Sequence, residues 1–207
     1  DTAQRTQAGC AIALVFAIAP QDEHAGIGAR LAALVEAGAG RVATGFLGTP
    51  LVLPALTLAG QHQGAWRLLM NEAAPGWLYQ VARGATTMWE RWDAILPDGS
   101  IHGGDMDAAD AASMISFNHY AYGCVGAWLY RTVAGIAPDA RVTGYRLIRF
   151  APVPGGGVDH AEARIETPFG QAAISWQQDP QSLTIDMLIP PGAEGCFACP
   201  PGWRLAT

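Results

Sequence analysis

The spacing of apolar residues changes near Pro138, and this change limits the fold more than any other feature. Before it, apolar residues recur at helical spacing, as they do over residues 24–37. After it, apolar and polar residues alternate, which is typical of half-buried strands. A chain with its helices first and its strands second forms two modules and not an interleaved βαβ fold. We therefore expect an α+β chain with two domains, residues 1–144 and 145–207.

Turn residues divide both parts of the chain into separate elements. Thr49 and Pro50 are typical of a helix start, since proline is tolerated in the first turn. The expected helices span residues 4–19, 24–37, 50–59, 63–71, 77–83 and 116–135. The expected strands, which we predict to pair antiparallel, span residues 145–150, 161–166, 173–176 and 183–189.

Composition excludes several functional classes. Hydrophobic residues make up 50% of the chain and charged residues 14%, which excludes a disordered protein. The net charge of −6 gives no basic surface for nucleic acid. No apolar run approaches the roughly 18 residues of a membrane helix, so no membrane partner is expected. All 12 basic residues are arginine, which excludes Schiff-base chemistry on a lysine.

Cysteine and aspartate spacings give no convincing metal or cofactor site. Cys196 and Cys199 form a CxxC pair, but a structural zinc site would need a second ligand pair. Asp105, Asp107 and Asp110 are spaced like part of a calcium loop, yet the glycine and closing glutamate of an EF-hand are missing. We therefore expect no metal and no cofactor.

The first candidate site surrounds Glu90, which lies between Trp89 and Trp92. The flat face of a tryptophan suits the apolar face of a sugar ring. A carboxylate between aromatic rings is partly desolvated, which raises its pKa and suits it to general acid or base catalysis. The alternative is an aromatic cluster that closes the helix ends, with Arg91 and Asp93 in an ordinary ion pair.

Two further segments carry polar groups near expected helix starts. Asn118 and His119 lie where the last expected helix opens, and both side chains can bind sugar hydroxyls. The alternative for His119 is a core histidine with satisfied hydrogen bonds near a helix cap. Thr44 and Gly45 lie in a glycine-rich loop that either lines a ligand or simply joins two helices.

Four segments together resemble the motifs of bacterial α-L-rhamnosidases, glycoside hydrolase family seventy-eight, in the same order. These are TGFLGTP at 44–50, GATTMWERWD at 84–93, SFNHYAYG at 116–123 and FAPVPGGG at 150–157. The resemblance implies a fragment of the six-hairpin glycosidase type, with the second half of an (α/α)6 barrel followed by an antiparallel β-sandwich. It also implies removal of terminal α-L-rhamnose from glycosides or polysaccharides, with inversion at the anomeric carbon.

The resemblance also assigns site residues. Inversion uses two carboxyl groups about 6.5–9.5 Å apart, one protonating the leaving oxygen and one activating water. Glu90 matches the position of the family's general base, and His119 matches a histidine that contacts the rhamnose. The expected substrate-binding residues are Trp89, Arg91, Trp92, Asn118, His119, Thr44 and Gly45.

The family's general acid belongs to an upstream motif that has no counterpart in this sequence. We therefore expect the chain to be the C-terminal part of a larger enzyme, or a shortened relative. Its partners would be a rhamnose-containing glycoside and either the remaining upstream part or a second subunit. The alternative function is a non-catalytic carbohydrate-binding or assembly module.

Overall fold

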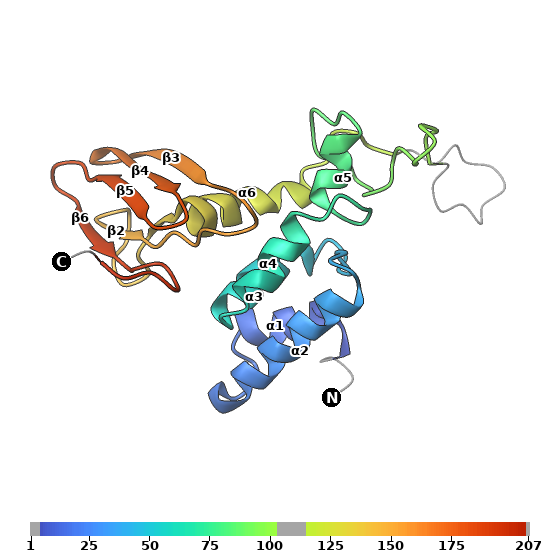
Figure 1. Ribbon diagram of the computed structural model, residues 1–207, viewed down its shortest axis with the longest axis horizontal. Coiled ribbons are helices and arrows are strands. Elements are labelled where there is room, and N and C mark those ends of the chain that lie inside the picture. Colours follow the sequence, from blue (N-terminus) through green and yellow to red (C-terminus); the bar gives the residue numbers. More distant parts are fainter. Residues whose placement is uncertain (1–4, 103–114, 206–207) are drawn as a thin grey trace. The chain divides into compact units, whose positions relative to one another are not determined.

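The computed structural model describes residues 5–102 and 115–205 and divides the chain into two compact units. The first unit is Asp1–Val125 and is built of helices. The second is Gly126–Thr207 and carries the strands (Figure 1). The expected order of helices first and strands second is thus confirmed.

The first unit packs short helices around an aliphatic core. Thr6 caps the first helix, since its side chain accepts a hydrogen bond from Gly9 N at 3.0 Å. Leu31, Val52 and Leu56 are fully buried where the helices meet. The helices of this unit are α1 (Gln7–Val15), η2 (Gln21–Glu23), α2 (His24–Ala37), α3 (Thr49–Leu58), α4 (His62–Leu69), α5 (Trp77–Ala82) and η3 (Ala121–Cys124).

Helix α1 is shorter than the predicted span of residues 4–19. It ends at Val15, and two residues later Ala17 adopts a φ of 49°, which a continuing right-handed helix does not allow. The apolar run continues past this point as Phe16 and Ile18, which are exposed. Composition alone therefore extended the predicted helix beyond its true end.

The long helix predicted over residues 116–135 is wrong in its first part. Residues 116–120 are not helical, because their backbone groups pair with another segment: His119 N donates to Met88 O at 2.8 Å. Helical structure begins at η3 and continues as α6 (Val125–Trp128) and a π-helix, η4 (Leu129–Ala134). It ends at Gly135, whose φ of 87° is left-handed.

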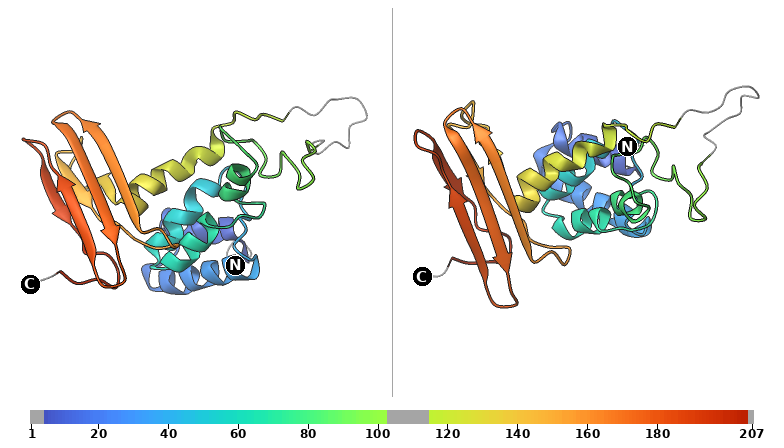
Figure 2. Two further views of the ribbon diagram at one scale, coloured as in Figure 1. Left: turned by 45° about the horizontal axis from the view of Figure 1, so that its top comes forward. Right: turned by 90° about the horizontal axis from the view of Figure 1, so that it is seen from above.

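The second unit contains two three-stranded sheets. The first has the order β1 (Ile136–Pro138), β2 (Leu147–Phe150) and β6 (Glu194–Phe197), with β1–β2 antiparallel and β2–β6 parallel. The second consists of β3 (His160–Thr167), β4 (Gly170–Gln178) and β5 (Leu183–Leu188), all antiparallel, and Figure 2 shows these strands side by side. Among the strands of the described residues, only the β2–β6 pair is parallel, which departs from the antiparallel arrangement that the alternation predicted.

Alternation places the core of this unit as expected. Ala163 on β3 and Ile174 on β4 are register partners and are buried, whereas Glu162 and Arg164 are exposed. Trp176 is 2% exposed and donates its indole N–H to Val133 O at 2.8 Å, which ties the sheet to the π-helix. The core cluster consists of Ala134, Ile136, Ile148, Phe150, Ala163, Ala172 and Ile174.

Gly135 cannot carry a side chain at the end of the π-helix. A Cβ there would lie 2.2 Å from Pro152 N, and the left-handed backbone disfavours any L residue. We expect Gly135→Ala to lower the free energy of unfolding by at least about 2 kcal/mol, measured by urea titration and circular dichroism.

Gly126 is the matched control because it lies in α6 with open space around its Cβ position. Gly126→Ala should raise the unfolding free energy by about 0.5–1 kcal/mol, since alanine favours a helix interior. Equal effects of the two substitutions would contradict this account of the helix end.

Candidate active site

Glu90 is half-buried in a segment that follows α5 and is hydrogen-bonded on both edges. On one edge, Glu90 N donates to Ser116 O at 2.9 Å. On the other edge, Trp89 N donates to Gln80 Oε1 at 3.1 Å, and Gln80 Nε2 donates to Arg91 O at 3.5 Å. The side chain is held as well, because Ser116 N donates to Glu90 Oε2 at 3.0 Å.

The segment around Glu90 runs beside the segment around His119. Besides the contacts of Glu90 with Ser116, His119 N donates to Met88 O and the Thr87 hydroxyl donates to Phe117 O. Two of the motifs singled out in the sequence, 84–93 and 116–123, therefore meet at Glu90.

Trp89 and Trp92 are buried, at 3% and 7% exposure. Trp92 stacks on Tyr122 with ring centroids 3.8 Å apart and meets the edge of Trp77 at 5.3 Å. Trp89 contacts Phe117 edge to face at 5.5 Å. In the described part of the chain the two indoles form the aromatic cluster of the alternative interpretation, and their contact with substrate stays a prediction.

His119 lies in a stack of aromatic rings that extends to the surface. The ring centroids of Phe46 and His119 are 5.0 Å apart, with an angle of 19° between the ring planes. The ring centroid of Tyr120 lies 5.6 Å from that of His119, with an angle of 1° between the planes. Ala121 N donates to His119 Nδ1 at 3.3 Å, so the proton of the neutral ring lies on Nε2. Asn118 is exposed beside this stack.

The stack also brings a third motif to the site, because Phe46 belongs to the segment 44–50. Phe46 is 44% exposed and Tyr120 is 90% exposed, so both present ring surface to solvent. Neither was predicted as a site residue. The signal that could have found them is an aromatic residue inside each motif, next to predicted sugar-binding positions.

Thr44 and Gly45 hold a loop-to-helix junction. Thr44 is 8% exposed, and its hydroxyl lies 2.8 Å from that of Thr49 at the start of α3. Thr49 also donates its hydroxyl to Gly45 O at 2.9 Å. These contacts fit the structural alternative for this loop, and a role of Thr44 and Gly45 at the pocket rim stays a prediction.

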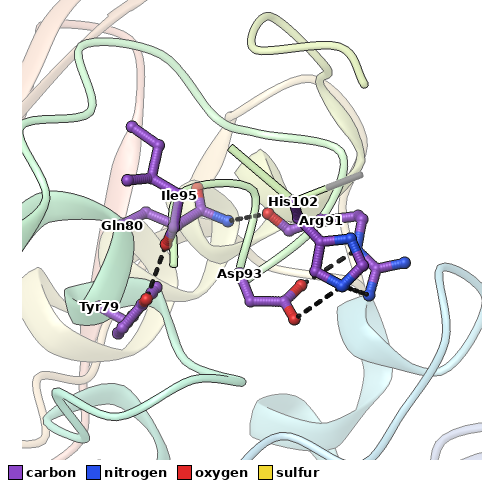
Figure 3. A network of polar contacts seen from close by, with 6 residues as sticks. All are labelled: Tyr79, Gln80, Arg91, Asp93, Ile95 and His102. Atoms are coloured by element: carbon purple, nitrogen blue, oxygen red, sulfur yellow. Dashed lines mark hydrogen bonds and ion pairs between the residues drawn. The ribbon is translucent and has the colours of Figure 1, made fainter. Parts of the chain in front are cut away.

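A polar network begins at Arg91, the residue that follows Glu90 (Figure 3). Arg91 Nε donates to Asp93 Oδ1 at 3.0 Å, and Arg91 Nη2 donates to His102 Nε2 at 3.2 Å. His102 Nε2 also lies 3.7 Å from Asp93 Oδ2, a contact that is an ion pair only when the ring is protonated. His102 was not predicted, because an isolated histidine carries no pattern.

Asp93 is unsuited to donate a proton. Burial works against its charge, but the hydrogen bond and charge of Arg91 outweigh burial, so the pKa of Asp93 lies below its ordinary value. A carboxyl with a lowered pKa stays ionised at neutral pH. Asp93 therefore does not supply the second, protonated carboxyl that inverting hydrolysis requires.

A surface groove of about 580 Å³ borders this network but does not include Glu90. Arg83 and Tyr79 both line it, with the Arg83 guanidinium 5.2 Å from the centre of the Tyr79 ring. The lining residues are Arg41, Glu72, Ala73, Ala74, Tyr79, Ala82, Arg83, Asp93, Leu96 and Pro97.

Within residues 5–102 and 115–205, no three His, Cys, Asp or Glu side chains are grouped to hold a metal ion. Asp105, Asp107 and Asp110 lie outside the described residues. Among the helices of the same ranges, none has both the length and the apolar character needed to cross a bilayer.

Comparison with known proteins gives similarity over nearly the whole chain. Residues 1–133 match the bacterial alpha-L-rhamnosidase 6 hairpin glycosidase domain, and residues 135–204 match the bacterial alpha-L-rhamnosidase C-terminal domain. An alpha-L-rhamnosidase of Streptomyces avermitilis is 41% identical over 186 residues, which is 90% of this chain and 17% of the relative.

Solved structures show the same similarity. The crystal structure of the Streptomyces avermitilis alpha-L-rhamnosidase in complex with L-rhamnose superimposes with a TM-score of 0.83 at 40% identity, covering 92% of this chain and 18% of that one. The crystal structure of the alpha-L-rhamnosidase of Aspergillus terreus superimposes with a TM-score of 0.85 at 34% identity, covering 93% of this chain and 21% of that one. The chain thus spans about a fifth of the length of the proteins it matches.

Arg91 and Asp93 offer a test of the polar network through a double-mutant cycle of Arg91→Met and Asp93→Asn. At pH 7 the coupling free energy should be about 0.5–1 kcal/mol, as for other partly exposed ion pairs. Because the folded-state pKa of Asp93 is lowered, this stabilisation is present above the ordinary carboxyl pKa of about 4 and is lost as the pH falls. Urea unfolding at pH 7 and pH 3 measures the coupling, and a coupling of equal size at both pH values would contradict the assignment.

Proposed function

This chain belongs to the bacterial α-L-rhamnosidases of the six-hairpin glycosidase type, and on that premise we propose that it supplies the general base of an inverting α-L-rhamnosidase. The family expected from the four motifs is confirmed. The expected fold class, part of a six-hairpin barrel followed by a β-rich C-terminal domain, is confirmed too.

One observation carries the proposal: two motif segments meet at Glu90, and a third reaches the neighbouring His119 through Phe46. Glu90 N donates to Ser116 O, its two chain neighbours are bonded to Gln80, and one carboxylate oxygen accepts the N–H of Ser116. A carboxylate can keep such a bond on one oxygen while the other takes a proton from water. In the proposed reaction, Glu90 deprotonates the water that attacks the anomeric carbon of a terminal α-L-rhamnoside. A second carboxyl, from a part of the enzyme outside this chain, protonates the leaving oxygen.

Neighbouring residues would bind the sugar. The Nε2–H of His119 can donate to a rhamnose hydroxyl, since Nδ1 is occupied by Ala121 N. Asn118 is exposed next to it and can bind another hydroxyl. Arg91 is the third residue proposed to donate hydrogen bonds to the sugar hydroxyls. The proposed walls of the pocket are Trp89 and Trp92, and the proposed rim is formed by Thr44 and Gly45.

The proposal requires a partner. Because the chain spans about a fifth of its relatives, the leaving-group acid would come from the remaining upstream part of the enzyme, or from a second subunit. The substrate would be a rhamnose-containing glycoside. We call the 207 residues joined to such an upstream part, either in one natural polypeptide or fused to that of the Streptomyces relative, the completed enzyme.

The base assignment is tested by Glu90→Gln in the completed enzyme with p-nitrophenyl α-L-rhamnoside. We expect kcat to fall by about 10²- to 10⁴-fold, because the amide cannot accept a proton from water. Glu36→Gln is the matched control: this exposed residue of α2 pairs with Arg67 at 3.2 Å and should leave kcat unchanged. Full activity of Glu90→Gln would remove Glu90 from the role of base.

Inversion is tested by identifying the anomer of rhamnose that is released first, using proton NMR at early reaction times. We expect β-L-rhamnose to form first from the α-glycoside. Initial release of α-L-rhamnose would show retention and overturn the proposed water activation. Rhamnose binding without turnover in the completed enzyme would favour the carbohydrate-binding module instead.

A further inference from the structure

We propose that Gln80 is a positioning residue that fixes the backbone of Glu90 from the interior of the helical unit. This inference rests on the proposed role of Glu90 as general base. Gln80 belongs to α5 and is 1% exposed, which is unusual for a long polar side chain. Its amide therefore needs partners inside the protein, and it finds them on both sides of Glu90.

The two bonds of the Gln80 amide fix its orientation. Trp89 N can only donate, so it must meet the side-chain oxygen, at 3.1 Å. Arg91 O can only accept, so it must meet the NH₂ group, at 3.5 Å. Among uncharged side chains of this length, only glutamine offers both a donor and an acceptor at its tip.

The residue between these partners is held by a different segment. The chain bends at Glu90 and Arg91. Trp89 N and Arg91 O are bonded to the Gln80 amide, whereas Glu90 N donates to Ser116 O at 2.9 Å. Glu90 is therefore held through its own backbone by Ser116 and through both chain neighbours by Gln80.

Gln80 also connects this segment to its own helix. Its backbone carbonyl accepts hydrogen bonds from Arg83 N at 3.1 Å and Ala85 N at 3.0 Å, which close the end of α5. The Figure 3 network continues outward from Arg91, through Asp93 and His102. The position of Glu90 is therefore set by a buried side chain of α5 as well as by the 116–119 segment.

A second buried glutamine provides a matched control. Gln7 of α1 is 3% exposed, and its amide bridges Arg41 O at 3.0 Å and Ala43 N at 2.9 Å. The chemistry and burial match those of Gln80, but the bridged segment is 41–43 and not the one that carries Glu90.

The test compares Gln80→Met with Gln7→Met in the completed enzyme, since methionine keeps the volume and loses both hydrogen bonds. Both should lower the melting temperature by a similar amount. Gln80→Met should lower kcat by about 10- to 100-fold with KM changed by less than about threefold, because a displaced base slows the chemical step. Gln7→Met should keep kcat within about threefold of the parent.

A second readout separates positioning from general damage. If Gln80 acts through Glu90, Gln80→Met should cause no further loss of kcat when Glu90→Gln is already present. Gln80→Asn, which keeps an amide but is too short to reach both partners, replaces Gln80→Met should the latter fail to unfold cooperatively.

Three results would overturn the proposal. Parent-like kcat in both Gln80 variants, or an undiminished loss in the Glu90→Gln background, would assign Gln80 a purely structural role while leaving the base assignment intact. Full activity of Glu90→Gln itself would overturn the base assignment, and the proposed role of Gln80 with it.

Discussion

The pairing between residues 87–90 and residues 116–119 is the interaction on which the arrangement of the candidate site depends. It satisfies backbone groups of both segments, and it directs the Glu90 carboxylate to Ser116 N. Without this pairing, polar backbone groups would be left unsatisfied in a half-buried place. Breaking it would therefore cost more free energy than one net hydrogen bond contributes. The buried amide of Gln80 completes it from the other edge.

Periodicity predicted the elements whose packing is local. The aliphatic spacing of α2 and the alternation of β3 and β4 each follow from one face being buried, and both are found in the structure. The start of the last helix could not be predicted from spacing, since residues 116–120 bond to a segment far away in the sequence. Their residue types, Ser, Phe, Asn, His and Tyr, are only moderate helix formers. The domain boundary expected after residue 144 stays a prediction.

In the candidate site too, several residues within motifs were predicted and residues that depend on distant contacts were not. Glu90, Asn118 and His119 were found through motifs, because four short segments in a fixed order carry far more information than any one residue. Gln80 and His102 were missed, since each depends on a contact with a residue that no local pattern connects to it. The ion pair of Arg91 with Asp93, two positions apart, was expected from proximity alone and is present.

The mutual hydrogen bonds between Glu90 and Ser116 join two residues that lie 26 positions apart in the sequence. Loop closure becomes only slightly more costly as a loop grows, so a change of length between two points fastened in this way costs little free energy. The backbone and the carboxylate of Glu90 are both bonded to Ser116, so such a change need not displace the proposed base.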